Sequence, residues 1–267
     1  CAQAFAKMPM SPLVFVAAVM MVVGFAFKIA AAPFHLWAPD VYRHAATPVA
    51  AFIASASKIG GVYLFAQVVS AFHREAILPV TVIVTVLSLL LGNLAALSQK
   101  SLSRLLAFSA VAHAGYILAG LCTAPNQPVP TTALTYYAVT YALATVGAFG
   151  VVLVLRRDLG ADNLDGLNGL NERSPALALL LAIFVLSLAG IPPLAGFFGK
   201  FYVFASALQG GSGMSIAVVV LALVMSAVSL YYYLLVLKRV FILPPETKDQ
   251  SPPQISGLTT VLLTLLA

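Results

Sequence analysis

The chain has 267 residues, of which 61% are hydrophobic and only 8% are charged, and its mean hydropathy is +1.02. A soluble domain would carry roughly 25% charged residues, so an ordinary soluble enzyme is excluded. The composition predicts an all-α polytopic membrane protein in contact with a lipid bilayer. The net charge of +6 gives no reason to expect a nucleic-acid partner, because basic residues in a membrane protein first report its topology.

The apolar segments predict about seven spanning helices and an incomplete eighth. The first covers residues 12–32, and a second piece continues through 34–41 behind Pro33. The others cover 47–70, 77–98, 101–122, 131–155, 175–208 and 214–243, and the incomplete helix covers 257–267. The segment 175–208 is too long for one straight span at about 1.5 Å per residue. Pro192 and Pro193 predict a break inside it, next to a glycine.

Basic residues divide unevenly between the two ends of these helices. The loops after the first, third, fifth and seventh helices hold nine of them, namely Arg43, Lys100, Arg104, Arg156, Arg157, Arg173, Lys238, Arg239 and Lys248. The opposite side has only Arg74, together with Lys7 near the N-terminus. The excess predicts that the first set lies on the cytoplasmic or matrix side.

Three lysines and one histidine remain inside the predicted spans, namely Lys28, Lys58, Lys200 and His113. All eight carboxylates fall in loops or in the joint after the first helix, so none is an obvious partner within the membrane. Charged residues within a span are costly and normally face a protein interior or a water-filled path. The four residues are therefore candidate proton carriers, and Ser109 and Tyr116 share the helix face of His113.

Each candidate also has a structural explanation. Lys58 could snorkel to an interface, although it lies about 16 Å from the start of its helix. Lys28 could end its helix beside the break, although its apolar flanks favour burial. Lys200 could cap a helix or lie at the interface, and His113 could be a hydrogen-bonded packing residue. The spacing of the four histidines does not resemble a zinc site, and the two cysteines provide no thiolate metal site.

The two proline-broken helices run in opposite directions on this topology, which favours an inverted repeat. Residues 1–74 would then hold the last two helices of a first five-helix repeat. Residues 75–243 would form the second five-helix repeat, and 244–267 a loop and the start of a final helix. We expect the three remaining helices of the first repeat to come from another polypeptide or from sequence that is not present.

Three stretches of the chain resemble one family: GFAFKIAAAPFHLWAPDVY at 24–42, TPVAAFIASASKIGG at 47–61 and SLAGIPPLAGFFGKFYVF at 187–204. They are similar to the N-type, or subunit 2, antiporter-like subunits of respiratory complex I. The resemblance implies a fold of fourteen spanning helices with two inverted repeats, of which this chain would cover the seventh to the start of the fourteenth. Lys28, Lys58, His113 and Lys200 match lysines of the seventh, eighth and twelfth helices and the histidine of the tenth. They would form part of a hydrated polar axis.

The resemblance also implies proton translocation driven by NADH oxidation and quinone reduction elsewhere in the complex. This chain would hold no cofactor, and FMN, iron–sulfur clusters and quinone would belong to partner subunits. Other membrane-arm subunits are expected partners, together with a separate chain that supplies the N-terminal helices and the glutamate partner of Lys28. A chain without an initiator methionine suits a divided protein of the mitochondrial inner membrane, with the bacterial plasma membrane as the alternative.

Two other functions stay open. The chain could belong to a multi-subunit cation/proton antiporter that works without redox chemistry. It could also be a structural scaffold that has lost proton transfer. The lysines within the predicted spans favour transport, because a scaffold has no need of charges inside the bilayer.

Overall fold

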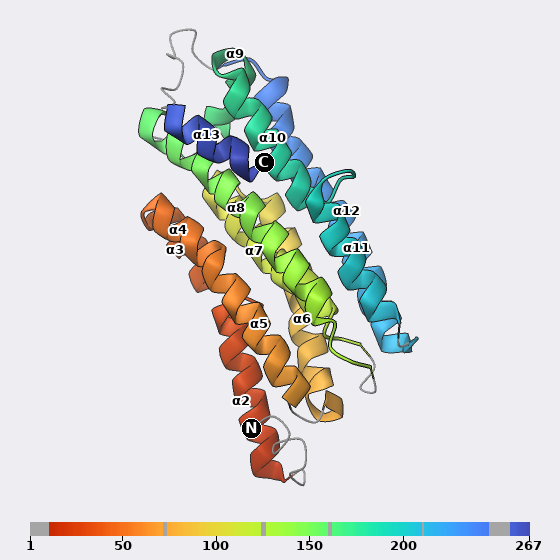
Figure 1. The fold of residues 1–267 in the computed structure, drawn as a ribbon. Coiled ribbons are helices and arrows are strands. Elements are labelled where there is room, and N and C mark those ends of the chain that lie inside the picture. Colours follow the sequence, from red (N-terminus) through yellow and green to blue (C-terminus); the bar gives the residue numbers. More distant parts are fainter. Residues whose placement is uncertain (1–10, 72–73, 124–126, 160–161, 210, 246–256) are drawn as a thin grey trace.

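A computed structural model describes residues 11–71, 74–123, 127–159, 162–209, 211–245 and 257–267. These residues form an elongated bundle of helices that run roughly along its length (Figure 1). Within them, five helical segments are long and apolar enough to cross a membrane, namely Thr47–Ser70, Ile77–Leu97, Leu102–Ala119, Thr131–Arg157 and Gly213–Phe241. Three shorter apolar helices are Pro12–Lys28, Pro175–Ala189 and Ala195–Leu208. The last two form one broken span, so the predicted set of about seven spans is present.

The first span consists of α2 (Pro12–Lys28) and the short α3 (Trp37–His44). Ser11 caps α2 by accepting a hydrogen bond from the backbone N–H of Val14. The helix ends at Lys28, four residues before the predicted end at 32, and the second piece starts at Trp37 and not at 34. The disturbance reaches further than predicted because Pro33 lacks an N–H and also restricts the residue before it.

The second predicted helix is divided into α4 (Thr47–Ala54) and α5 (Ala56–Ala71). Ser55 lies between them, and its Oγ donates to the Ala51 carbonyl at 2.5 Å, which also accepts from the Ser55 N–H at 3.1 Å. A serine that bonds back to the preceding turn bends a helix. This break was not predicted, because it contains neither proline nor glycine.

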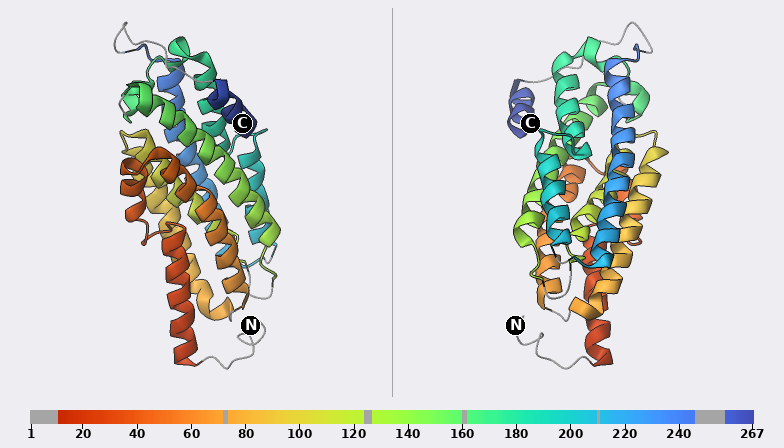
Figure 2. Two further views of the ribbon diagram at one scale, coloured as in Figure 1. Left: turned by 60° about the vertical axis from the view of Figure 1, so that its left-hand side comes forward. Right: turned by 90° about the vertical axis from the view of Figure 1, so that its right-hand side faces the viewer.

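Three long helices follow: α6 (Arg74–Leu97), α7 (Leu102–Ala119) and α8 (Thr131–Leu159). α7 is buried along almost its whole length. Small residues let it approach its neighbour closely, since a Cβ on Gly115 would lie 2.9 Å from the backbone nitrogen of Leu89 on α6. α7 is therefore the central helix of the bundle. Figure 2 shows the bundle in two further views.

The polar connection after α8 contains a 3-10 turn, η1 (Leu164–Leu167), and the short α9 (Leu170–Arg173). The next span is broken as predicted, into α10 (Pro175–Ala189) and α11 (Ala195–Leu208). Gly190 ends α10 with a φ of 84°, a conformation that favours glycine. α12 (Gly213–Phe241) completes the bundle, and α13 (Gly257–Leu266) packs outside α8 (Figure 1).

The buried apolar residues form two clusters, one towards each end of the bundle. On α7 the first cluster reaches Ala110, and the second begins at Ala112. On the α10–α11 span the first cluster includes Ala189 and the second Val203. The boundary between the clusters therefore lies at mid-height, where His113 and Lys200 are found. The assignment of 1–74 and 75–243 to two repeats stays a prediction.

Candidate functional site

Lys58 lies at the boundary of the two apolar clusters, one turn after the break at Ser55. Its side chain is 2% exposed. The amine donates a hydrogen bond of 2.5 Å to the Ala110 carbonyl on α7 and lies 5.1 Å from the centroid of the Tyr141 ring on α8. A backbone carbonyl and an aromatic face both stabilise a cation. Lys58 is thus buried as predicted, and three helices hold its amine in place.

His113 on α7 contacts a tyrosine hydroxyl through each of its ring nitrogens. Nδ1 is 2.8 Å from the hydroxyl of Tyr137 on α8, and Nε2 is 3.4 Å from the hydroxyl of Tyr233 on α12. The Tyr233 hydroxyl is also hydrogen-bonded to Ser109 Oγ. All four side chains are buried. The imidazole can therefore exchange a proton on two sides.

Lys200 on α11 is bound directly to the break in its own span. Its amine donates to the Ala189 carbonyl at 2.8 Å and to Ser226 Oγ at 2.9 Å. Ala189 is the last residue of α10, where the break leaves carbonyls without intrahelical partners. The amine also lies 4.6 Å from the centroid of the Tyr116 ring. The break thus supplies an acceptor for a lysine that is only 5% exposed.

Two tyrosine rings join the lysines to His113. The Tyr141 ring beside Lys58 lies 4.8 Å from the His113 ring, between centroids. The Tyr116 ring beside Lys200 lies 5.6 Å from it. We use the term central row for this contact series, which is Lys58–Tyr141–His113–Tyr116–Lys200. It crosses four helices at the mid-height of the bundle.

The central row continues into uncharged polar side chains. Asn93 Oδ1 on α6 accepts from the hydroxyls of Tyr116 and Tyr232, each at 3.3 Å, and Asn93 Nδ2 donates to the Leu89 carbonyl at 2.8 Å. Buried amides and hydroxyls are costly unless they are bonded. This network fixes the Tyr116 ring that faces Lys200.

Sequence reasoning missed Tyr137, Tyr141 and Tyr233, which make most of these contacts. A signal for two of them was available, since Tyr137 and Tyr141 are four residues apart and must share one face of their helix. Tyr233 carried no such signal, because its position depends on how α12 packs against α7. The sequence placed only Ser109 and Tyr116 on the same face as His113.

Lys28 is separate from the central row and is exposed. The expectation that its apolar flanks bury it is therefore wrong for the described chain. It lines a groove of about 530 Å³ between α2 and α5, together with Ser57, Gly60 and Gly61. None of the described helices covers this face of α2. Lys28 is thus available to an element outside the described residues.

A cluster of polar groups, here called the clamp, ties the loop after α8 to the start of α7. The Asp162 carboxylate accepts from the hydroxyls of Ser101 and Ser103, at 2.6 Å and 2.9 Å. Arg156 pairs with Asp162 at 2.9 Å and donates to the Arg43 carbonyl at 2.8 Å. The clamp therefore also holds the end of α3.

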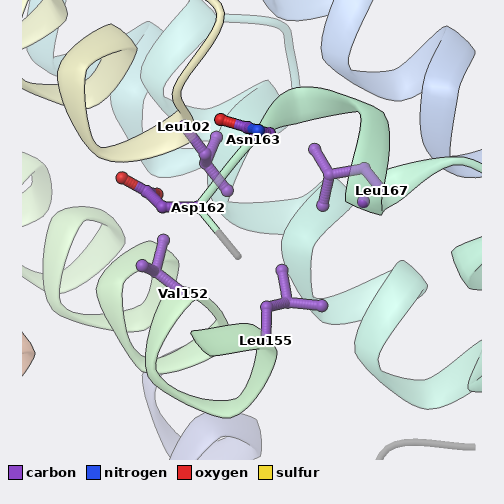
Figure 3. Close-up of a pocket in the computed structure, with 7 residues that line it drawn as sticks. Leu102, Val152, Leu155, Asp162, Asn163 and Leu167 are labelled. Atoms are coloured by element: carbon purple, nitrogen blue, oxygen red, sulfur yellow. The ribbon is translucent and has the colours of Figure 1, made fainter. Parts of the chain in front are cut away.

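The apolar space below Asp162 is small. Figure 3 shows Leu102, Val152, Leu155 and Leu167 around it. Its volume is about 10 Å³, which is room for roughly one water molecule. This space is therefore too small for a substrate, and the clamp around it acts as a structural joint.

Several basic residues that the predicted topology assigned to one side of the membrane lie at the same end of the bundle. Arg156 contacts the Arg43 carbonyl, and Arg239 at the end of α12 pairs with Asp165 in the same loop region. Lys7 and Lys248 lie outside the described residues. In the described part of the chain, no group of three histidine, cysteine or acidic residues is placed to hold a metal ion.

The sequence has clear relatives. Residues 2–226 match the family described as NADH:quinone oxidoreductase/Mrp antiporter, TM. NADH-quinone oxidoreductase subunit N 2 of Acidobacterium capsulatum is 50% identical over 267 residues, which cover 95% of this chain and 53% of that protein. Subunit N 1 of Roseiflexus castenholzii is 42% identical over 277 residues, which cover 96% and 51%. The chain spans about half the length of these curated relatives.

The fold is also similar to that of chains in solved structures. A chain of respiratory complex I from Thermus thermophilus with bound aureothin has a TM-score of 0.82 and 38% identity, covering 98% of this chain and 57% of that one. A chain of the Mrp complex from Dietzia sp. DQ12-45-1b has a TM-score of 0.82 and 26% identity, covering 94% and 46%. These relatives are bacterial and give no support to a mitochondrial location. The chain is an integral, multi-pass membrane protein that belongs to the NADH:quinone oxidoreductase/Mrp antiporter transmembrane family.

Proposed function

We propose that the chain is part of a subunit N of an NADH:quinone oxidoreductase and that it moves protons along the central row. NADH oxidation and quinone reduction would occur in other subunits, which would hold FMN, iron–sulfur clusters and quinone. The observation that carries this proposal is the central row itself. It places two buried lysine amines on either side of a buried imidazole, with one tyrosine ring in each interval.

The chemistry of the central row suits protons. A lysine amine and an imidazole both exist in protonated and neutral forms, and their hydrogen-bond partners here are neutral carbonyl and hydroxyl groups. A charge on one member disfavours a charge on the next, since electrostatic interactions are strong at low dielectric constant. Protonation at Lys58 would therefore favour proton release from His113, and the same coupling would act between His113 and Lys200.

A cation/proton antiporter without redox chemistry is the second candidate, and the similarity to the Mrp complex supports it. The residue types of the central row favour the first candidate. Alkali metal ions bind oxygen ligands such as carboxylates and carbonyls, whereas protonated amines repel them. The curated relatives named above are also subunits N. A scaffold without transport would have no reason to keep Lys58 and Lys200 buried.

We further propose a bacterial plasma membrane location, with the clamp on the cytoplasmic side. The clamp end carries the excess of basic residues in the loops. Other membrane-arm subunits would be the partners of the chain. The exposed face of α2 would be covered by further helices, of the same polypeptide or of a separate one, and these would supply an acidic partner for Lys28.

The test is a Lys58→Ala substitution in the complete complex. Sealed inverted membrane vesicles are supplied with NADH, and the protons taken up are counted per NADH oxidised. We expect proton uptake per NADH to fall, while a Lys238→Ala variant at an exposed position stays unchanged. Unchanged proton uptake per NADH in a normally assembled Lys58→Ala complex would falsify the proposal. Sodium-dependent transport without NADH would favour the antiporter.

A further inference from the structure

We propose that Tyr233 is a further proton-transfer residue, and that Tyr137, His113, Tyr233 and Ser109 form a hydroxyl–imidazole relay. This relay crosses the central row at His113. The proposal rests on the proposed function, because it assumes that His113 carries protons. It goes beyond that function by giving His113 a second route, with named residues on both sides of the ring.

The relay is continuous in the structure. Tyr137 and Tyr233 come from different helices and approach different nitrogens of one imidazole, at 2.8 Å and 3.4 Å. The Tyr233 hydroxyl is shared between His113 Nε2 and Ser109 Oγ. All four side chains are at most 1% exposed. A hydroxyl that is shared between two partners can donate to either, so each hydrogen bond in the relay can reverse.

The relay runs in a different direction from the central row. Ser109 precedes His113 by four residues on α7, which places it about 6 Å nearer the clamp. Tyr137 precedes Tyr141 on α8, and α8 reaches the clamp at Arg156, so Tyr137 lies further from the clamp than the central row. The central row therefore crosses the width of the bundle, whereas the relay follows its length. A relay in this direction would move protons across the membrane at His113.

The proton balance closes at each atom. A hydronium ion gives a proton to Ser109 Oγ, and the original Ser109 proton passes to the Tyr233 oxygen. The original Tyr233 proton passes to His113 Nε2, while the Nδ1 proton passes to the Tyr137 oxygen. Tyr137 then releases its original proton to a water molecule. Each oxygen and the imidazole gain one proton and lose one, so rotation of the hydroxyls and return of the ring tautomer restore the starting state.

The test compares two tyrosines on the same helix. Tyr233→Phe removes the shared hydroxyl and keeps the ring. Tyr231→Phe removes the hydroxyl of a tyrosine that is 58% exposed. A positioned proton-transfer group contributes about 10²-fold or more to a rate, so we expect NADH-driven proton uptake to fall by about 10²-fold in Tyr233→Phe. Tyr231→Phe should match the parent complex. Equal uptake in the two variants would overturn the relay.

Two further variants keep the outcomes distinct. Ser109→Ala interrupts the relay with a smaller change of packing, and it decides the question if Tyr233→Phe fails to assemble on a native gel. Reduced uptake in Ser109→Ala supports the relay, and parent-like uptake rejects it. Lys58→Ala is measured in the same vesicles. If Lys58→Ala lowers uptake while Tyr233→Phe leaves it at the parent level, the relay is wrong and the proposed function stands. If Lys58→Ala pumps normally, the proposed function itself is wrong.

Discussion

Two broken spans of this molecule differ in the side chains that bind the free backbone groups at their breaks. After α2, the N–H of Ala32 donates to Ser88 Oγ on α6 at 2.8 Å. At the end of α10, the carbonyl of Ala189 accepts from the Lys200 amine at 2.8 Å. A break inside a membrane is tolerated only where its backbone groups find such partners. A hydroxyl satisfies the backbone N–H at the first break, whereas a lysine amine satisfies the backbone carbonyl at the second.

The position of each lysine explains the difference. Lys28 precedes its break and is the last residue of α2, and its side chain is exposed in the groove between α2 and α5. Lys200 follows its break, and its side chain reaches back to the end of α10. The two lysines have similar sequence surroundings, but only Lys200 makes a hydrogen bond to the break in its own span. Lys200 therefore combines a structural and a proposed functional role, whereas Lys28 has only the latter.

The largest effect is expected from Lys200→Met. This change removes one charge of the central row and leaves the Ala189 carbonyl without its donor, at a cost of about 1–3 kcal/mol in stability. Both NADH-driven proton uptake and the thermal unfolding temperature of the subunit in the solubilised complex should fall. A variant that loses proton uptake but unfolds at the parent temperature would show that the lysine does not stabilise the break.

Lys28→Met should lower proton uptake and leave the unfolding temperature of the subunit unchanged. The side chain is exposed, and no described hydrogen bond depends on it. Both variants are compared in the same preparation. A loss of stability in Lys28→Met as large as in Lys200→Met would contradict the distinction between the two breaks.

Ser88→Ala tests the first break. The Ala32 N–H would lose its acceptor in a buried site, which costs about 1–3 kcal/mol. Hydrogen exchange around the break should become faster, and the subunit should unfold at a lower temperature. Proton uptake per NADH should change little, because Ser88 lies outside the central row. If exchange around residues 29–36 stays at the parent rate, another group satisfies this N–H.

A smaller loss of stability than in Lys200→Met is expected from Ser226→Ala. Lys200 would lose one of its two hydrogen bonds and keep the Ala189 carbonyl, so the cost should be about 0.5–1.5 kcal/mol. Its unfolding temperature should lie between those of the parent and Lys200→Met. An effect as large as that of Lys200→Met would mean that the serine, and not the carbonyl, is the main partner of the amine.

Much of the fold could be predicted from local sequence. Long apolar runs located the spans, and Gly190 with the two following prolines located the second break within a residue or two. The break at Ser55 could not be predicted, because a serine inside an apolar run is compatible with a straight helix. The exact end of α2 was also missed, since proline disturbs residues before it as well as after it.

The titratable residues of the candidate site could be predicted from the sequence, but their surroundings could not. Burial of Lys58, His113 and Lys200 followed from their depth in apolar segments, because depth along a helix is fixed by residue number. The tyrosines around them were not identified as a set. Their ring contacts depend on how α7, α8 and α12 rotate against one another, which no single segment encodes.

The sequence by itself determined that this chain crosses a membrane several times, that two of its spans are interrupted, and that titratable groups lie at mid-membrane depth. Hydropathy and proline chemistry act locally, so they can be recognised along the chain. The tertiary structure alone decided that Lys58, His113 and Lys200 are joined through Tyr141 and Tyr116 while Lys28 lies outside this row. Side-chain contacts between helices depend on packing, which sets the rotation and register of each helix against its neighbours.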